Sequence, residues 1–288
     1  MIRFPLSDVA LSKVNTIAVL KDLSYSAENW QVNQHEFALQ VPGVGSFYAC
    51  DGKEVEYSVV PGADPGWVKL YLNGQVLAAL LHQRRIINFH ASSFIHDGRG
   101  VMILGETGAG KSSLTVSFAL AGAGFLSDDL TPVLFRRSKP FIWPLYRDIK
   151  LRENTVTQLE INRKKLREAE KGTGKQYLDV NRADVRDHQL NTVLKIEIGN
   201  CREPEFHEPS PAEKFSLLRS EICSWEILAG MPETEAVYLQ QLLHIVEQVR
   251  FVRVVRPDEI EISDLHAAVS KYLAVTERLK AKGEERKF

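Results

Sequence analysis

The chain has 288 residues, of which 44% are hydrophobic and 25% are charged, and its formal net charge at pH 7 is -1. The near-zero charge excludes the global basic field with which proteins bind nucleic acid or an anionic membrane. No apolar run reaches the roughly 18 residues of a transmembrane helix, so we expect neither a nucleic-acid partner nor a membrane partner. The length suits one large domain or two modest ones.

The N-terminus and the cysteines give an expectation about the compartment. The first twenty residues include Asp8 and lack a small-residue cleavage site, so they do not form a typical signal peptide. Cys50, Cys201 and Cys223 are odd in number and widely spaced. That pattern fits neither a disulfide framework nor a zinc site. We therefore expect a cytoplasmic protein.

Residues 1–75 are predicted to form a small β-rich unit, and residues 76–288 a larger domain. In the first unit, Glu36–Val41 and Val55–Val60 carry the β-branched and aromatic residues that are typical of strands. Four dipeptides that favour turns separate such stretches: Pro42-Gly43, Asp51-Gly52, Pro61-Gly62 and Pro65-Gly66.

A helix followed by several strands is predicted at the start of the larger domain. A compact helical pattern covers Gln75–Gln83, and a strand is expected over Arg84–Phe89. The strands Ser92–His96 and Gly100–Leu104 follow, joined by a turn over 97–100. This hairpin leads directly into the next segment, which differs from the usual parallel βαβ entry.

That next segment, residues 105–112, reads GETGAGKS and matches the phosphate-binding loop G-x-x-x-x-G-K-[ST]. Its glycines let successive N–H groups point at an anion, while Lys111 reaches the β- and γ-phosphates and Ser112 can ligate Mg²⁺. A helix predicted over Ser112–Ala121 adds its N-terminal affinity for anions. The predicted nucleotide-binding residues are Gly105, Glu106, Thr107, Gly108, Ala109, Gly110, Lys111, Ser112 and Ser113.

Asp128 and Asp129 follow the short predicted strand Gly124–Leu126 and are candidates for the chemistry. Phosphoryl transfer needs Mg²⁺ held against the phosphates and a carboxylate that orients or deprotonates the acceptor. Adjacent strand residues point to opposite faces, so the two carboxylates can face one metal only if the chain bends there. The alternative is a plain turn before the predicted strand Thr131–Phe135. His90 ends a neighbouring strand and could approach the phosphate or the aspartates.

The remaining elements are predicted with less detail. Residues 136–190 are expected to be loop-like, with one helix near Thr155–Glu170. Arg147, Lys150 and Arg152 could line the nucleotide site or form a solvated face, and Lys171–Lys175 could be a lid or a plain loop. The expected C-terminal elements are a strand over Asn191–Ile198 and helices over Pro211–Arg219, Thr234–Val249 and Asp264–Lys280, the last capped by Ser263.

The residues from His90-Ala-Ser, through Gly105–Ser112, to Leu126–Asp129 together resemble the bacterial HPr kinase/phosphorylase family. They are most similar to the shorter HPr-kinase-related kinases found beside peptide-maturation genes. The resemblance covers about residues 85–135 well and extends weakly to about 225, whereas the first 75 residues have no match. The strand with which the family recognises HPr is not recognisable here, so HPr is not the expected substrate.

The resemblance implies an α/β fold with a P-loop core like that of phosphoenolpyruvate carboxykinase and HPr kinase, with C-terminal helices. It implies a kinase that uses ATP and Mg²⁺ to phosphorylate a hydroxyl, most plausibly a serine of a peptide or protein, and that can form a homo-oligomer. By the same resemblance Asp128 is the base, Lys111 the phosphate clamp and His90 the partner of Asp128, while Ser112 and Asp129 hold the metal. The two aspartate roles could be exchanged, because the sequence does not orient the side chains.

Three other functions remain open at this stage. The acceptor could be a small hydroxylated molecule such as free serine. The protein could instead be a switch or assembly factor that hydrolyses a nucleotide slowly, although it lacks a guanine-reading Asn-Lys-x-Asp segment. It could also be a non-catalytic binding subunit, although every chemical position is intact.

Overall fold

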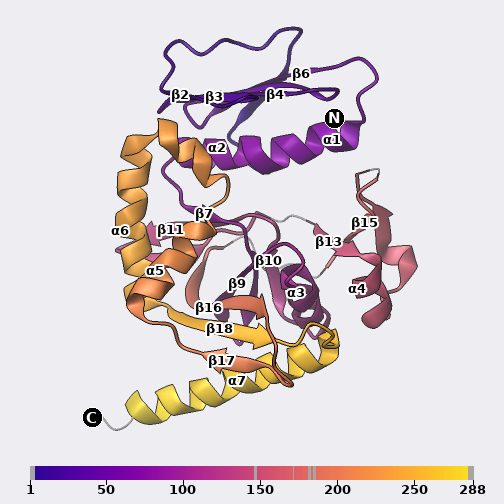
Figure 1. Cartoon of the computed structure of the whole chain (residues 1–288), viewed down its shortest axis with the longest axis vertical. Coiled ribbons are helices and arrows are strands. Elements are labelled where there is room, and N and C mark those ends of the chain that lie inside the picture. Colours follow the sequence, from indigo (N-terminus) through magenta and orange to yellow (C-terminus); the bar gives the residue numbers. More distant parts are fainter. Residues whose placement is uncertain (1–3, 146–147, 171, 181–182, 184–185, 285–288) are drawn as a thin grey trace.

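The computed structural model describes residues 4–145, 148–170, 172–180, 183 and 186–284. The chain forms a mixed α/β structure of stacked layers (Figure 1). An N-terminal sheet lies on a helical segment, and beneath that segment lies a larger sheet with helices on both of its faces. In the part of the chain that the structure describes, no helix combines the length and apolarity that crossing a membrane requires.

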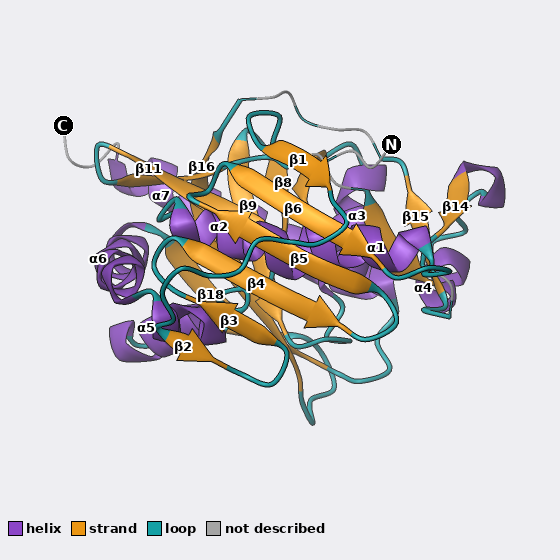
Figure 2. Ribbon diagram, turned by 90° about the horizontal axis from the view of Figure 1, so that it is seen from above, coloured by secondary structure: helices purple, strands orange, loops and turns teal. Residues whose placement is uncertain are grey.

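The N-terminal sheet has the strand order β1-β6-β5-β4-β3-β2, and only the β1–β6 pair is parallel (Figure 2). The predicted strand over Glu36–Val41 is confirmed as β4, and the predicted strand over Val55–Val60 is β6, shifted by one residue. The strands are β1 (Ala10–Lys13), β2 (Tyr25–Ser26), β3 (Trp30–Val32), β4 (Glu36–Val41), β5 (Gly45–Cys50) and β6 (Glu54–Val59).

A helical segment connects the two sheets and runs without a break from residue 65 to residue 83. It consists of α1 (Pro65–Tyr71), a π-helical turn (Leu72–Val76) and α2 (Leu77–Gln83). The predicted turn at Pro65-Gly66 is wrong, because Asp64 caps the helix by accepting a 2.7 Å hydrogen bond from the Gly66 N–H. The predicted domain boundary after residue 75 falls inside this segment.

In the larger sheet, the strand that leads into the glycine-rich loop is β9, which lies between two other strands. Strand β9 pairs with β8 as an antiparallel hairpin, as predicted, and with β16 in parallel. The predicted strand over Arg84–Phe89 is reduced to β7, because Arg85 has a φ of 57° and turns the chain. The strands are β7 (Asn88–Phe89), β8 (Ser92–His96), β9 (Arg99–Gly105), β10 (Gly124–Ser127), β11 (Thr131–Arg136), β12 (Lys139–Ile142), β16 (His188–Ile198), β17 (Glu205–His207) and β18 (Arg250–Arg256).

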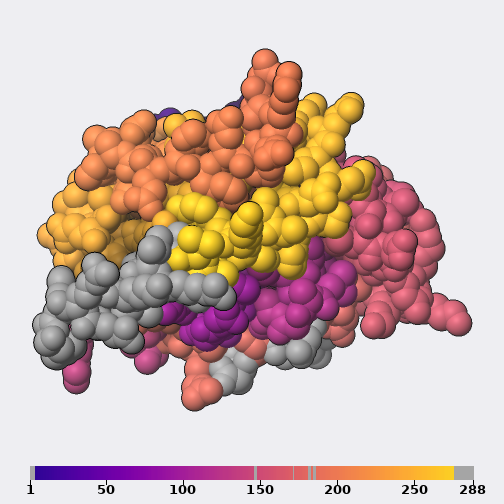
Figure 3. Space-filling model, turned by 90° about the horizontal axis from the view of Figure 1, so that it is seen from below, coloured from indigo at the N-terminus to yellow at the C-terminus, as the bar shows by residue number. Residues whose placement is uncertain are grey.

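The two faces of this sheet bury different sets of helices because side chains alternate along β9. Val101 and Ile103 face α3 (Lys111–Leu120) and α7 (Ile262–Glu284). Met102 and Leu104 belong to a cluster with side chains of α6 (Pro232–Gln248) and α5 (Pro211–Ser220). The described part of α7 forms much of the surface seen from below (Figure 3).

The region between β12 and β16 differs most from the prediction. The loop-like stretch contains a small sheet of β13 (Ile149–Arg152), β14 (Leu166–Glu168) and β15 (Lys175–Leu178). The helix predicted over Thr155–Glu170 is wrong beyond α4 (Glu153–Gln158), because Glu160 has a φ of 48°, which ends helical geometry. Buried residues of this sheet and of α4 pack against α3.

The three predicted C-terminal helices are present as α5, α6 and α7, each within about two residues of its predicted start. A Ser210–Glu213 capping box fixes the start of α5. Ser263 lies inside α7 and not at its N-cap, so that prediction is wrong. Strand β18 was not predicted, and it adds a parallel neighbour to β16.

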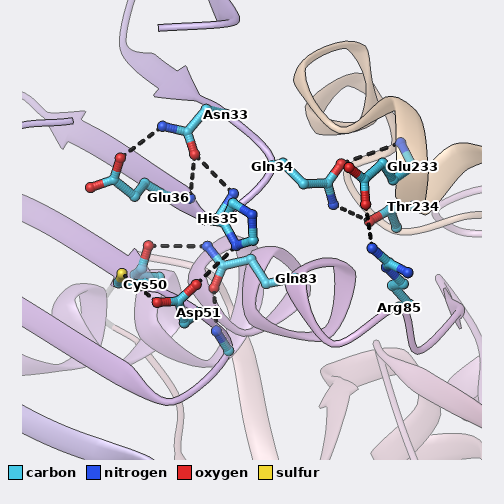
Figure 4. A network of polar contacts seen from close by, with 12 residues as sticks. Asn33, Gln34, His35, Glu36, Cys50, Asp51, Gln83, Arg85, Glu233 and Thr234 are labelled. Carbon is cyan, nitrogen blue, oxygen red and sulfur yellow. Dashed lines mark hydrogen bonds and ion pairs between the residues drawn. The ribbon is translucent and has the colours of Figure 1, made fainter. Parts of the chain in front are cut away.

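The N-terminal sheet and the rest of the chain share one buried cluster, which joins Phe37 and Phe47 to Leu104 and Phe251. Polar contacts fix the same arrangement (Figure 4). The Gln34 amide donates to Thr234 on α6 at 2.8 Å, and the Gln83 amide on α2 donates to the carbonyl oxygen of Ala49 on β5 at 3.0 Å. The sheet is therefore held firmly above the larger one.

Candidate active site

The glycine-rich segment 105–112 joins strand β9 to helix α3 through a tight backbone path. Gly110, at the N-cap of α3, has a φ of 107°, a conformation that residues with a side chain rarely adopt. At Gly105, a Cβ atom would lie 2.7 Å from the carbonyl oxygen of Ile196 on β16. Both glycines are therefore needed for the path that delivers the loop to the N-terminus of α3, where unpaired N–H groups attract anions.

The ammonium group of Lys111 is held at this loop. Its Nζ donates to the carbonyl oxygen of Gly105 at 2.6 Å and to that of Glu106 at 3.3 Å. Burial lowers the pKa of Lys111, although Glu221 and Asp128 act in the opposite direction. The lysine ammonium is thus held against the glycine-rich loop.

Asp128 is buried and accepts three hydrogen bonds. Its Oδ1 accepts from the hydroxyl of Ser112 at 2.9 Å and from the hydroxyl of Ser92, and its Oδ2 accepts from the Lys150 N–H at 3.4 Å. Burial raises the pKa of Asp128, and the neighbouring carboxylate of Asp129 raises it further, despite these hydrogen bonds. Asp128 therefore belongs to the same cluster as the loop serine.

Asp129 provides the backbone bend that two adjacent carboxylates need in order to share one site. Its φ is 64°, and the Ser127 hydroxyl closes the turn by donating to the carbonyl oxygen of Leu130. The Asp129 side chain is 43% exposed, and its Oδ2 lies 3.9 Å from the Nζ of Lys150. Unlike buried Asp128, it is accessible to a ligand.

His90 is held by its backbone, because its N–H donates a hydrogen bond to the carbonyl oxygen of Glu221 at 2.7 Å. Burial lowers the pKa of His90, and the charge of Lys111 lowers it further, while Asp129 and Glu221 raise it. The imidazole is therefore neutral at pH 7. Among the described residues, Asp128 is hydrogen-bonded to serines and a backbone N–H, so the predicted His90–Asp128 pair is not formed.

The ammonium group of Lys150, which Glu170 holds in place, also belongs to this cluster of polar side chains. Lys150, on β13, lies 3.3 Å from Oε1 of Glu170, and the Tyr177 hydroxyl donates to the same oxygen at 2.6 Å. Burial raises the pKa of Glu170, but the hydrogen bond from Tyr177 and the charge of Lys150 lower it overall, so the carboxylate is ionised at pH 7. Glu170 thus holds Lys150 beside Asp129.

The glycine-rich loop lines a cavity of about 490 Å³, a size typical of small-molecule sites. Two of the predicted nucleotide-binding residues, Gly105 and Ala109, do not line this cavity, and their carbonyl oxygens accept hydrogen bonds from Lys111 and Arg256. Arg152 and Lys175, two of the predicted cations, also line this cavity, whereas Arg147 and Lys171 lie outside the described residues. The predicted nucleotide-binding residues that line it are Glu106, Thr107, Gly108, Gly110, Lys111, Ser112 and Ser113.

A second cavity, of about 1260 Å³, lies between the N-terminal part of the chain and the larger sheet. Its walls include Val59 from the N-terminal sheet, Lys69 from α1 and Trp225, which begins the 3₁₀ helix Trp225–Gly230 after α5. His90, Asp129 and Lys150 line both cavities, and Asp128 lines the second one. Of the predicted catalytic residues, His90 therefore lies where the two cavities meet, whereas Lys111 lines the first cavity and Asp128 the second.

A buried ion pair behind the site was not predicted. Lys195 on β16 contacts Glu221, and both side chains are almost fully buried. Glu221 is the residue whose carbonyl oxygen holds His90, and its charge raises the pKa of Lys111. A lysine within the apolar run Thr192-Val-Leu-Lys-Ile196 is the signal that could have revealed the pair.

Together these observations define a mixed α/β protein in which a glycine-rich loop at the N-terminus of α3 lies beside two adjacent carboxylates. No protein-family model and no curated protein matches the chain. Among the solved structures that match is the HPr(Ser) kinase/phosphatase from Coxiella burnetii, with 15% identity and a TM-score of 0.36. That match covers 69% of this chain and 94% of the other.

The raised pKa of Asp128 predicts a pH dependence of stability. The folded protein keeps this proton up to about pH 6, whereas the unfolded chain releases it near 3.8. The folded state therefore binds more protons in that window, and its stability falls as the pH rises through it. Relative to Asp128→Asn, the wild type should lose on the order of 2 kcal/mol of unfolding free energy between pH 4 and pH 7.

Urea unfolding at a series of pH values measures this difference. The matched control is Asp22→Asn, at an exposed position. Its unfolding free energy should follow that of the wild type at every pH. Parallel profiles for Asp128→Asn and the wild type would contradict the prediction.

Proposed function

We propose that this protein is a kinase that transfers the γ-phosphoryl group of ATP to a hydroxyl group. The observation that carries this proposal is the meeting of two cavities at His90, Asp129 and Lys150, with the glycine-rich loop lining only one of them. Direct transfer needs a donor and an acceptor whose reacting oxygens lie roughly in line across the phosphorus. A nucleotide switch has no use for the second cavity.

The proposed roles of the two aspartates are the reverse of those that the family resemblance implies. Asp129 is the base, because its accessible carboxylate lines both cavities and can accept the proton of an acceptor hydroxyl. Asp128 takes the metal side, because it is buried and hydrogen-bonded to Ser112, the loop serine. The backbone bend at Asp129 lies between the buried carboxylate of Asp128 and the exposed carboxylate of Asp129.

Mg²⁺ would be held by Ser112 and Asp128 together with phosphate oxygens. The hydroxyl of Ser112 and Oδ1 of Asp128 lie 2.9 Å apart, and such oxygens are the ligands that Mg²⁺ prefers. The described residues contain no cluster of three or more His, Cys, Asp or Glu side chains that could hold a metal. Mg²⁺ characteristically uses one or two carboxylates, with phosphates and waters. When bound, it neutralises charge on the phosphate oxygens.

The cations around the loop stabilise the transferred charge. Lys111 binds the β- and γ-phosphates, and Lys150, held by Glu170, lies at the junction where the phosphoryl group crosses. Lys175 and Arg152 line the nucleotide cavity and add positive charge there. His90, neutral at pH 7, can donate or accept one hydrogen bond at the junction. These groups suit a triphosphate on one side and an uncharged hydroxyl on the other.

The second cavity is the proposed acceptor site. Its volume of about 1260 Å³ exceeds the roughly 1,000 Å³ at the upper end of small-molecule sites. This favours a serine in a peptide or protein segment over free serine. The β-rich N-terminal unit supplies part of the wall through Tyr57 and Val59, so we propose that this unit helps to select the acceptor.

Incubation with ATP-Mg²⁺ and the peptides and proteins encoded near this gene, followed by mass spectrometry, tests the proposal. A serine should gain one phosphoryl group, and free serine should not compete with the peptide. Lys111→Ala should abolish labelling, whereas Lys139→Ala, at an exposed position on β12, should retain it. Phosphate release without acceptor labelling as the main activity would favour a hydrolytic switch.

A further inference from the structure

Three segments that line the nucleotide cavity are joined to one another by hydrogen bonds: the glycine-rich loop, helix α4 and the start of α7 with the residues before it. The loop wall meets α4 where the Ser113 and Thr155 hydroxyls lie 2.8 Å apart. Helix α4 meets the start of α7 where the Ile262 N–H donates to the Gln158 side chain at 3.2 Å. The third wall is the segment 258–262 with Leu265.

Arg256 closes this ring of walls. Its Nε donates to the carbonyl oxygen of Ala109 at 2.9 Å, and its Nη1 donates to those of Pro257 at 2.7 Å and Asp258 at 2.8 Å. The Arg256 side chain is buried, so these carbonyl oxygens take the place of water as its hydrogen-bond acceptors. One guanidinium therefore fixes the segment that begins at Asp258 directly beside the glycine-rich loop.

The third wall lies away from the site of transfer. The γ-phosphate must face the junction at His90, Asp129 and Lys150, since the acceptor enters from the other side of that junction. The nucleoside must then lie toward walls that line the nucleotide cavity and not the acceptor cavity. Helix α4 and the segment 258–262 with Leu265 meet this condition.

The chemistry of these two walls differs. Helix α4 contributes polar side chains, Asn154, Thr155 and Gln158. The third wall contributes Ile260 and Ile262, both half-buried, and Ile260 also packs against the core beneath α7. A nucleobase is a flat group with apolar faces, so apolar side chains in a cavity are suitable partners for it. Carboxylates of the same wall, at Asp258, Glu259 and Glu261, repel a polyphosphate placed there.

We propose that Ile260 and Ile262 form the nucleobase subsite of this protein, held beside the phosphate loop by Arg256. The proposal rests on the proposed function in taking the loop cavity as the nucleotide site. It adds that a nucleoside triphosphate binds with its base on this wall, so that part of its affinity comes from apolar contact and not from phosphate.

Equilibrium binding of ATP and of inorganic tripolyphosphate separates the two contributions. Wild-type protein should bind ATP at least about tenfold more tightly than tripolyphosphate, a difference that corresponds to about 1.4 kcal/mol. Ile260→Ala should weaken ATP binding by about tenfold and leave tripolyphosphate binding unchanged, which also shows that the variant is folded. Ile198→Ala, the same change at an exposed position of β16 outside both cavities, should change neither affinity.

Equal affinity of the wild type for ATP and tripolyphosphate would overturn the base subsite, as would equal weakening of both by Ile260→Ala. These outcomes are distinct from failure of the kinase proposal. A protein that binds ATP through Ile260 but labels no acceptor has the subsite without the transfer activity. A protein that labels an acceptor but binds tripolyphosphate as tightly as ATP has the activity without the subsite.

Discussion

Replacing Asp129 by Asn is expected to lower the rate of phosphoryl transfer by about 10²- to 10⁴-fold, the range typical of a lost general base. The amide has nearly the same shape and keeps the positive φ that Asn tolerates well, so the bend at this position should persist. ATP affinity should change little, because Asp129 faces the junction and the loop binds the phosphates. Single-turnover rates and ATP binding, measured on the same preparation, check both parts.

Asp128→Asn is the matched comparison, because it makes the same change one residue earlier. With Asp128 on the metal side, this variant should need more Mg²⁺ to reach its maximal rate, since Ser112 loses its charged neighbour. A normal rate for Asp129→Asn, together with an Asp128→Asn variant that saturating Mg²⁺ does not rescue, would return the role of base to Asp128.

Replacing Lys195 by Met is expected to destabilise the protein by about 3–5 kcal/mol, the cost of leaving one member of a buried ion pair without its partner. Lys195 and Glu221 are almost fully buried, so neither charge gains solvation when the other is removed. The double variant Lys195→Met/Glu221→Leu should recover most of this free energy, because it removes both charges. Urea unfolding of the three proteins measures the differences.

A second pair on the same sheet provides the control for this experiment. Arg253 and Glu197, on β18 and β16, are 2.7 Å apart but partly exposed, so water solvates either charge when the other is lost. Arg253→Met should therefore cost no more than about 1 kcal/mol. An equal loss for Arg253→Met and Lys195→Met would show that burial is not the cause.

The sequence predicted the hairpin, loop and helix around residues 92–121 closely because several local signals agree there. The apolar run before Gly105 predicts a buried strand, the glycines predict the loop, and Gly122 and Gly124 mark the end of the helix that Lys111 opens. The need for a bend at the aspartates also followed from strand geometry, and the φ of 64° at Asp129 supplies it.

The sequence did not predict features that depend on distant contacts. Strands β13, β14 and β15 are short and rich in charged residues, and their pairing with one another is a long-range property that no local pattern encodes. The orientation of the Asp128 carboxylate depends on Ser92, Ser112 and the Lys150 N–H, which come from three separate elements. The second cavity also depends on distant contacts, because residues of the N-terminal sheet such as Tyr57 and Val59 form part of its wall.

The division of labour between the two cavities has a consequence for how such a protein diversifies. The wall that faces the acceptor is built largely from residues before position 80 and from 220–226, whereas the loop cavity is built from 106–114, 154–158 and 256–265. His90, Asp129 and Lys150 line both cavities, and the charge of Glu221 acts on Lys111, but other substitutions in one set change no residue that lines the other. Under the proposed function, selection can therefore change the acceptor while most of the lining of the loop cavity is inherited unchanged.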